Sequence, residues 1–115
     1  MKSTTTYKKW DIILVPFPFT DLTSLKKRPC LVISPDEYNK GSDILISFIT
    51  SKLDREKRLG DYKIEKWEKS KLPKPSMIRM KFATIDKSIV VKKIGSLEEP
   101  DISKFQEEIM TFFKK

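Results

Sequence analysis

The sequence predicts a mainly β fold, a small barrel with a helix at its C-terminal end. Short apolar runs rich in β-branched residues, at residues 12–15, 30–33 and 43–49, each suit a buried strand. The spacing between five or six such segments is that of hairpins, and a small barrel hides the edges of its strands. After Glu98 the apolar pattern changes to helical spacing.

The first two strands should enclose a polar loop. Pro16 and Pro18 fix φ and remove two backbone donors, so the first strand should end in an edge or irregular conformation near Phe17 and Phe19 rather than continue pairing. Arg28 precedes Pro29 and is therefore pushed into an extended conformation. We expect Arg28 at the mouth of the second strand with its guanidinium toward the loop, where a fixed cation suggests an anion site.

The middle of the chain continues this pattern. We expect a helical turn over residues 36–41, a strand over 43–49 closed by Thr50 and Ser51, and a charged surface loop over 52–60. Four of the nine residues in this loop are basic, so contact with a nucleic-acid backbone is the alternative to a purely solvated connection.

The last third of the chain should add further strands and the helix. Arg79 and Lys81 are interleaved with apolar residues over 77–82, so both cations should share one face of a strand. Four segments follow from the same reasoning: a short strand over 61–65, a short helix or ordered loop over 66–72, a turn over 84–87 and a last strand over 89–94.

The predicted C-terminal helix has acidic residues near its N-terminal end, lysines near its C-terminal end and Pro100 in its first turn. Its apolar face should pack on the barrel and comprises Ile102, Phe105, Ile109, Phe112 and Phe113.

A chain of 115 residues suits one domain. Residues 1–8 are polar and without periodicity, so we expect a flexible N-terminal tail before a single domain over 9–115. No run approaches the roughly 20 apolar residues of a membrane helix, and the N-terminus lacks the apolar centre of a secretory signal, so we expect a cytoplasmic protein. Cys30, the single cysteine, should be a core residue.

Charge and composition restrict the chemistry. Lys and Arg number 24 against 16 acidic residues, a net charge of +8 that attracts polyanions and favours a nucleic acid or an acidic protein as partner. Solubility alone is the alternative explanation. Without histidine and with one cysteine, the chain has no His acid–base pair, His-ligated zinc or thiolate metal site. It also has no clustered carboxylates and no glycine-rich phosphate loop, so no cofactor is expected.

The order of these features resembles the MazF/PemK family of toxin endoribonucleases. The resemblance is carried by Asp11 with its apolar run, the polar loop, Arg28-Pro29 before an apolar strand, and Ile49-Thr50-Ser51. Residues 75–79 and 84–87 extend it over nearly the whole chain from Trp10 onward. It implies an SH3-like barrel of the CcdB/MazF/Kid type, with five to seven strands, short helices and a C-terminal helix.

The resemblance also implies a function, that of the toxin component of a toxin–antitoxin system. Such a toxin is a metal-independent, sequence-selective endoribonuclease, or mRNA interferase. It cleaves single-stranded RNA by attack of a ribose 2′-OH, leaving a 2′,3′-cyclic phosphate or 3′-phosphate and a 5′-OH. It would act as a homodimer whose RNA groove spans the interface, and an acidic antitoxin would suit its charge. The alternative is a non-catalytic relative that binds RNA or inhibits a protein such as DNA gyrase.

In that family the Arg of the Arg-Pro pair and the Thr of the Ile-Thr pair form the catalytic site, and they match Arg28 and Thr50. A guanidinium offers a permanently charged fork of donors, so we assign Arg28 to charge stabilisation in the transition state, with proton donation to the leaving oxygen as a further role. The hydroxyl of Thr50 would orient the phosphate. Taken alone, Arg28 also suits a surface residue and Thr50 a backbone cap.

Further residues are expected to contact RNA: Thr20, Asp21, Lys26, Lys27, Ser51, Arg79 and Lys81. Two positions depart from the family pattern. Trp10 stands where the family commonly has Gly, and Met80 and Lys81 occupy a region in which some members carry an acid–base carboxylate. The proton acceptor therefore stays open, with Asp21 and Glu37 as alternatives.

Overall fold

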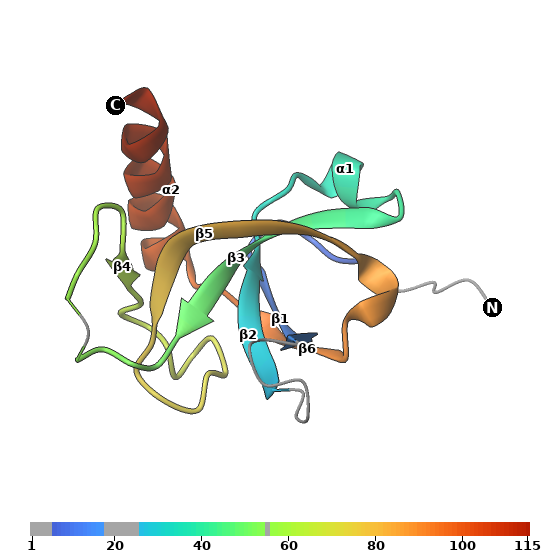
Figure 1. Ribbon diagram of the computed structural model, residues 1–115, viewed down its shortest axis with the longest axis horizontal. Helices are drawn as coiled ribbons and strands as arrows, with labels where there is room; N and C mark the ends of the chain where they lie inside the picture. The colour runs from blue at the N-terminus through green and yellow to red at the C-terminus, as the bar shows by residue number, and fades with distance from the viewer. Residues whose placement is uncertain (1–5, 18–25, 55) are drawn as a thin grey trace.

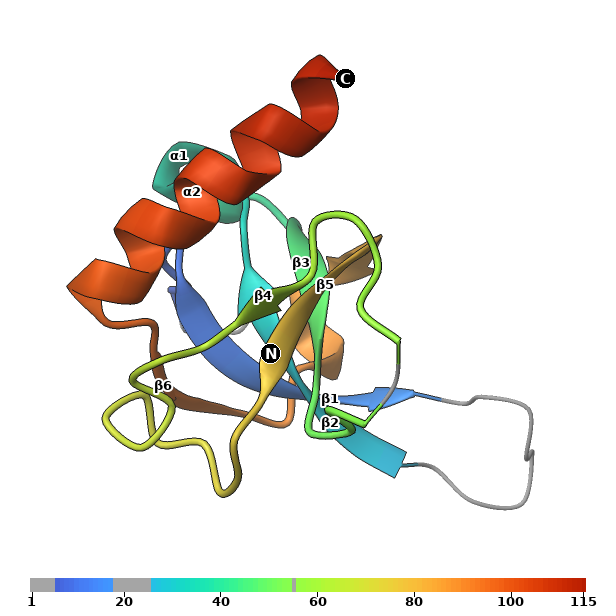
Figure 2. The same cartoon turned by 90° about the vertical axis from the view of Figure 1, so that its left-hand side faces the viewer.

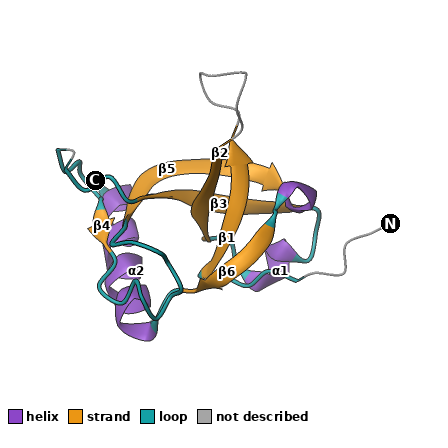
Figure 3. Ribbon diagram, turned by 90° about the horizontal axis from the view of Figure 1, so that it is seen from below, coloured by secondary structure: helices purple, strands orange, loops and turns teal. Residues whose placement is uncertain are grey.

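The computed structural model describes residues 6–54 except 18–25, and residues 56–115 (Figure 1). Its elements follow in the order β1 (Asp11–Phe17), β2 (Lys26–Val32), α1 (Asp36–Asn39), β3 (Asp43–Thr50), β4 (Tyr62–Lys63), β5 (Met77–Asp86), the 3₁₀ helix η1 (Lys87–Ile89), β6 (Lys92–Ser96) and α2 (Glu99–Lys114). The strands form one antiparallel sheet in the order β4-β5-β3-β2-β1-β6. The sheet is curled into a half-barrel (Figure 3), which confirms the mainly β prediction with its C-terminal helix.

The β1–β2 hairpin extends further than the apolar runs alone predicted. β1 ends at Phe17, but it stays paired with β2 through Pro16 and Phe17, where pairing was expected to stop. β2 begins at Lys26, and the ladder pairs Val15 with Arg28. Phe19 lies outside the described residues. Arg28 therefore lies inside a strand rather than at its mouth. The extension is possible because β2 pairs with β3 only from Cys30 onward, so the missing N–H of Pro29 costs no bond on that side.

Both faces of the curled sheet are apolar, because the pleat sends alternate residues of each strand to opposite sides. Ile12 and Leu31 belong to the core cluster that includes Phe105 of α2, whereas Ile13 and Cys30 belong to a second cluster on the other face. Figure 2 shows α2 lying across one face of the sheet. The sheet therefore has two cores, only one of which the helix covers.

A bulge interrupts the β3–β5 ladder. Ser47 pairs with Phe82 and Ile49 with Ile78, so Phe48 alone faces residues 79–81. The Oγ of Ser47 donates a hydrogen bond to the carbonyl oxygen of Arg79, at 2.5 Å. This bond occupies a backbone acceptor in the bulge, which lies where β5 bends around the sheet (Figure 1).

The turn predicted over residues 84–87 is wrong for most of its length. Thr84 and Ile85 continue β5 and pair with Leu45 and Ile44. The chain turns only at η1, where the side chain of Asp86 accepts the N–H of Ser88. The ladder outweighs the local turn signal here, because β3 extends far enough to pair with the whole segment. The last strand accordingly begins at residue 92 rather than 89.

Helix α2 is held at its N-terminal end and projects at the other. Asp101 is fully buried and accepts hydrogen bonds from the Tyr62 hydroxyl at 2.5 Å and from the N–H groups of Glu65 and Lys66 at 2.8 Å. Phe113, by contrast, is 65% exposed, although its ring stacks on Phe82 of β5, so it contacts the sheet as predicted without being buried. The final turns extend beyond the sheet, which leaves part of the apolar face uncovered (Figure 1).

The packed structure begins before the predicted boundary at residue 9. Tyr7 is 5% exposed and belongs to the second core cluster, and the N–H of Lys8 donates to Asp11. Residues 1–5 of the predicted tail lie outside the described part of the chain. Over the part that the structure describes, no helix is both long and apolar enough to span a membrane.

Candidate nucleic-acid interface

A pocket of about 620 Å³ lies beside the bulge between β3 and β5. Among the described residues, five Lys or Arg side chains and one carboxylate line it, so this lining carries a net positive charge, as a site for an anion requires. The remaining lining is largely apolar. The lining residues are Arg28, Phe48, Ile49, Thr50, Lys52, Arg58, Leu59, Asp61, Arg79, Met80, Lys81 and Phe112.

Arg28 and Thr50, the two residues predicted to be catalytic, line this same pocket, and both are half-buried. Their proximity follows from the sheet. The β2–β3 ladder pairs Cys30 with Phe48, and extending that antiparallel register by two residues sets Arg28 opposite Thr50 on the same face. Neither residue is sealed in the core.

The hydroxyl of Thr50 also caps the backbone, the alternative role that the sequence suggested for it. Its Oγ1 accepts a hydrogen bond from the backbone N–H of Lys52, at 3.2 Å. A hydroxyl that accepts one bond keeps its proton as a donor. The Lys52 contact therefore holds the side chain without using its O–H.

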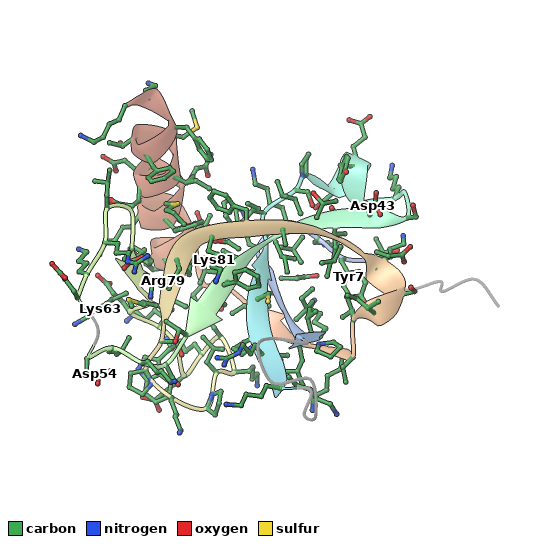
Figure 4. All side chains as sticks on the ribbon, in the orientation of Figure 1. Tyr7, Asp43, Asp54, Lys63, Arg79 and Lys81 are labelled. Atoms are coloured by element: carbon green, nitrogen blue, oxygen red, sulfur yellow. The ribbon has the colours of Figure 1, made fainter. Side chains whose placement is uncertain are left out.

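Arg79 and Lys81 both line the pocket, on the part of β5 that lies next to α2 (Figure 4). Simple alternation would send Met80 to the opposite face, yet Met80 lines the pocket too, as expected of a bulge that disrupts the pleat. The Nζ of Lys81 lies 5.5 Å from the centroid of the Phe48 ring, within the range of a cation–π contact.

A tight turn over residues 58–61 forms the wall of the pocket opposite the strands. The backbone N–H of Asp61 donates to the carbonyl of Arg58 at 3.0 Å, and an Asp61 carboxylate oxygen accepts the Arg58 N–H at 2.9 Å. The other carboxylate oxygen lies 3.6 Å from the Nε of Arg79. This carboxylate therefore joins the turn to β5.

Three other predicted RNA contacts lie outside this lining. Lys26 and Lys27 are exposed at the start of β2, and Ser51 is exposed next to Thr50. Thr20 and Asp21 lie outside the described residues. Glu37, one alternative for the proton acceptor, is exposed on α1 and does not line the pocket.

Sequence reasoning missed three polar residues of the pocket, Lys52, Arg58 and Asp61. The first two belong to the loop over 52–60, for which the density of basic residues left contact with a nucleic-acid backbone as the alternative, without naming a residue. Asp61 had no local signal, because its partner Arg79 comes from a distant strand.

Cys30 lies close in sequence to Arg28 but offers no nucleophile. Burial raises the pKa of its thiol to about 12, although the charge of Arg28 opposes the shift. A thiol with this pKa stays protonated near neutral pH. Across the described ranges, no three His, Cys, Asp or Glu side chains gather in a group that could hold a metal ion.

Comparisons with known proteins agree with this fold. A family model described as the PemK-like, MazF-like toxin of type II toxin-antitoxin systems matches residues 8–113. Comparison with curated proteins gave no match.

Several solved structures are similar to this chain. A mycobacterial endoribonuclease in complex with its cognate antitoxin superposes with a TM-score of 0.74 at 12% identity, over 91% of this chain and 92% of that one. The Mycobacterium tuberculosis toxin MazF-mt6 gives 0.72 at 17% identity, over 90% and 96%. A chain of the Form-II MazE-MazF structure from Deinococcus radiodurans gives 0.73 at 14% identity, over 96% and 97%. At these identities the similarity shows the fold, and the family model adds the membership: the chain belongs to the PemK-like, MazF-like toxin family of type II toxin-antitoxin systems.

Proposed function

We propose that this toxin is a metal-independent endoribonuclease that cleaves single-stranded RNA in the pocket between β3, β5 and the turn over residues 58–61. The observation that carries the proposal is that Arg28 and Thr50, from neighbouring strands, line one cationic pocket. Five cations against one carboxylate suit a polyanion, and the apolar lining suits an unstacked base.

The proposed reaction is a transesterification within the RNA. The ribose 2′-oxygen attacks the adjacent phosphorus as its proton passes to water. The bond from phosphorus to the 5′-oxygen breaks as that oxygen takes up a proton from Arg28 or water, and a 2′,3′-cyclic phosphate and a 5′-OH result. Charge builds up on the phosphoryl oxygens as the 2′-oxygen adds. The guanidinium of Arg28 would stabilise that charge, and the Thr50 hydroxyl would orient the phosphate by donating its proton in a hydrogen bond.

The test is cleavage of an RNA oligonucleotide in EDTA, beside the same sequence with 2′-deoxyribose at the cut site. We expect cleavage of the RNA alone, because the deoxy strand lacks the nucleophile. Arg28→Ala should lower kcat about 10²–10³-fold. Arg28→Lys should remain impaired because an ammonium lacks the planar fork.

Thr50→Ala provides a second arm, with the exposed Thr84→Ala on the far part of β5 as its matched control. We expect slower cleavage for the first variant only. Cleavage of the deoxy strand, or full activity of Arg28→Ala, would contradict the mechanism. RNA left intact by the unmodified protein would favour a non-catalytic relative.

The proposal includes a homodimer. Leu59, Met110 and Phe113 are 63%, 55% and 65% exposed, and the Phe113 ring stacks on Phe82 at a centroid distance of 5.6 Å. Exposed apolar side chains of this kind suit burial against a second copy of the chain, because burial removes apolar surface from water. Phe113→Asp should shift the protein toward the monomer in analytical ultracentrifugation, whereas exposed Lys114→Asp should not. A monomer at all concentrations of the unmodified protein would contradict the dimer.

The cognate antitoxin, on this proposal, presents an acidic segment to the pocket. The net charge of the pocket lining favours such a segment and repels a basic one. Acidic peptides should therefore compete with RNA, and less so for Lys52→Ala. If acidic peptides competed with RNA equally well on the unmodified protein and on Lys52→Ala, the antitoxin would bind elsewhere.

A further inference from the structure

We infer that Asp61 is a positioning residue, which orients the guanidinium of Arg79 toward the RNA phosphate in the pocket. The inference rests on the proposed nuclease function and deepens it. It starts from an apparent contradiction, because Asp61, the one carboxylate in the described lining of the pocket, repels the polyanion that the five cations there would attract. A negative charge in this place needs another role.

The side chain of Asp61 is positioned to contact protein rather than substrate. It is 2% exposed, whereas the Arg79 side chain is 15% exposed. One carboxylate oxygen accepts the N–H of Arg58 at 2.9 Å, and the other lies 3.6 Å from the Nε of Arg79. Both oxygens thus face protein donors, which leaves Asp61 poorly placed to accept a proton from a ribose.

The turn that presents Asp61 has little room to move. Gly60 has a φ of +90°, which an L side chain rarely adopts, and a Cβ there would lie 2.4 Å from Cγ of Met80 and 3.1 Å from Phe112. The turn is therefore packed against β5 and α2 and also closed by the Asp61–Arg58 hydrogen bonds. A rigid support of this kind fixes its contacts within small limits.

Arg79 is suited to being held at one edge while it binds at another. Its guanidinium carries five N–H donors in a fixed plane, and Asp61 faces the Nε edge. The terminal nitrogens keep four of those donors for a phosphate. The backbone of Arg79 is fixed as well, because its carbonyl accepts the Ser47 hydroxyl at 2.5 Å. Arg79 would thus join Arg28 as a second oriented guanidinium on the reacting phosphate.

The expected results separate the loss of orientation of Arg79 from the change in the net charge of the pocket. Asp61→Asn keeps an oxygen for the Arg58 N–H but removes the negative charge that faces Arg79. The pocket becomes more positive, so RNA should bind as tightly or more tightly, while kcat should fall at least tenfold because Arg79 is no longer held. Asp54→Asn, an equal charge change at an exposed site on the same loop and outside the pocket lining, should leave kcat unchanged.

Single-turnover cleavage and RNA binding in EDTA, with a thermal melt to confirm folding, give the measurements. In an Arg79→Ala background, Asp61→Asn should cause no further loss of kcat, because the carboxylate acts through the missing guanidinium. Weaker RNA binding, an unchanged kcat, or an additive loss in that background would each overturn the inference. Arg79→Lys leaves the turn intact, and its single ammonium should give the same fall in kcat. Full activity of Arg79→Lys would also overturn it.

A readout that does not use activity distinguishes this inference from the proposed function. In ¹⁵N spectra, the Nε–H of Arg79 should be protected from exchange in the unmodified protein and lose protection in Asp61→Asn. If the Arg79 Nε–H were protected from exchange but the protein did not cleave RNA, the proposed nuclease function would be refuted and the Asp61–Arg79 contact would be supported. Cleavage with no difference in protection would refute the positioning role alone.

Discussion

Trp10 adopts a backbone conformation that favours glycine, with a φ of +78°. Its N–H and carbonyl bond to Val32 and Leu97, and its ring packs edge-on against Phe105 at 5.9 Å. Trp10, which stands where the resemblance leads one to expect Gly, thus has a left-handed backbone, and its ring contacts offset the strain.

A pair of substitutions at Trp10 separates the backbone from the ring. Trp10→Gly and Trp10→Ala both lose the aromatic packing and should both be destabilised, but only Ala retains the strained Cβ. The Gly variant should be more stable than the Ala variant by about 1 kcal/mol, the reverse of the usual order. Urea denaturation would measure the difference, and a more stable Ala variant would show that the strain is absent.

Cys30 gives a second prediction for a single residue. Because burial raises the pKa of its thiol from 9.0 to about 12, very little thiolate forms at pH 8. A thiol reagent should therefore modify the native protein at least about a hundredfold more slowly than the protein unfolded in guanidinium chloride. Rapid labelling of the native protein would show that β2 opens readily or that the thiol is accessible.

At the scale of the element, the bulge in β5 depends on a single hydroxyl. Ser47 is fully buried, and its Oγ satisfies the Arg79 carbonyl. Ser47→Ala should leave that buried acceptor without its bond and cost about 1–3 kcal/mol in the free energy of unfolding. Exposed Ser103→Ala on α2 should change it by less than about 0.5 kcal/mol. Equal effects in chemical denaturation would show that the hydroxyl does not support the bulge.

Helix α2 depends similarly on one carboxylate. Asp101→Ala would leave the Tyr62 hydroxyl and two backbone N–H groups without their shared acceptor. We expect a loss of about 3 kcal/mol or more in the free energy of unfolding, because several buried donors lose their partner together. Tyr62→Phe removes one donor and keeps the acceptor, so its loss should be smaller. Thermal and urea unfolding would rank the two, and the opposite order would contradict the anchoring role.

At the scale of the whole molecule, the net charge of +8 should make RNA binding strongly dependent on salt. Each cation that neutralises a phosphate of single-stranded RNA contributes about 0.7 to the slope of log K against log salt. Arg58→Ala should lower that slope by about this amount, whereas exposed Lys40→Ala on the turn after α1 should not. Filter binding over a range of KCl concentrations would test this, and equal slopes for both variants would remove Arg58 from the RNA surface.

The features that the sequence predicts are those set by neighbours along the chain. The β-branched runs of β1 to β3 and the helical spacing after Glu98 are local patterns, and the structure contains each of these elements. That Arg28 and Thr50 share one site was predicted from the resemblance to the family and not from the strand propensity of the residues around them. The bulge and the Asp61–Arg79 contact depend on segments distant in the sequence, so no local pattern could indicate them. The exposed end of α2 depends on where the sheet stops.

The placement of Arg28 and Thr50 on adjoining strands has a consequence for how such a toxin can diversify. A residue inserted before Lys26 would leave both side chains on their shared face, since the register from Cys30 onward is unaffected. A residue inserted between Arg28 and Cys30 would rotate the guanidinium to the opposite side of the sheet. On the proposed function, a change of length before β2 could therefore alter which RNA is cut, while Arg28 and Thr50 keep their place opposite each other.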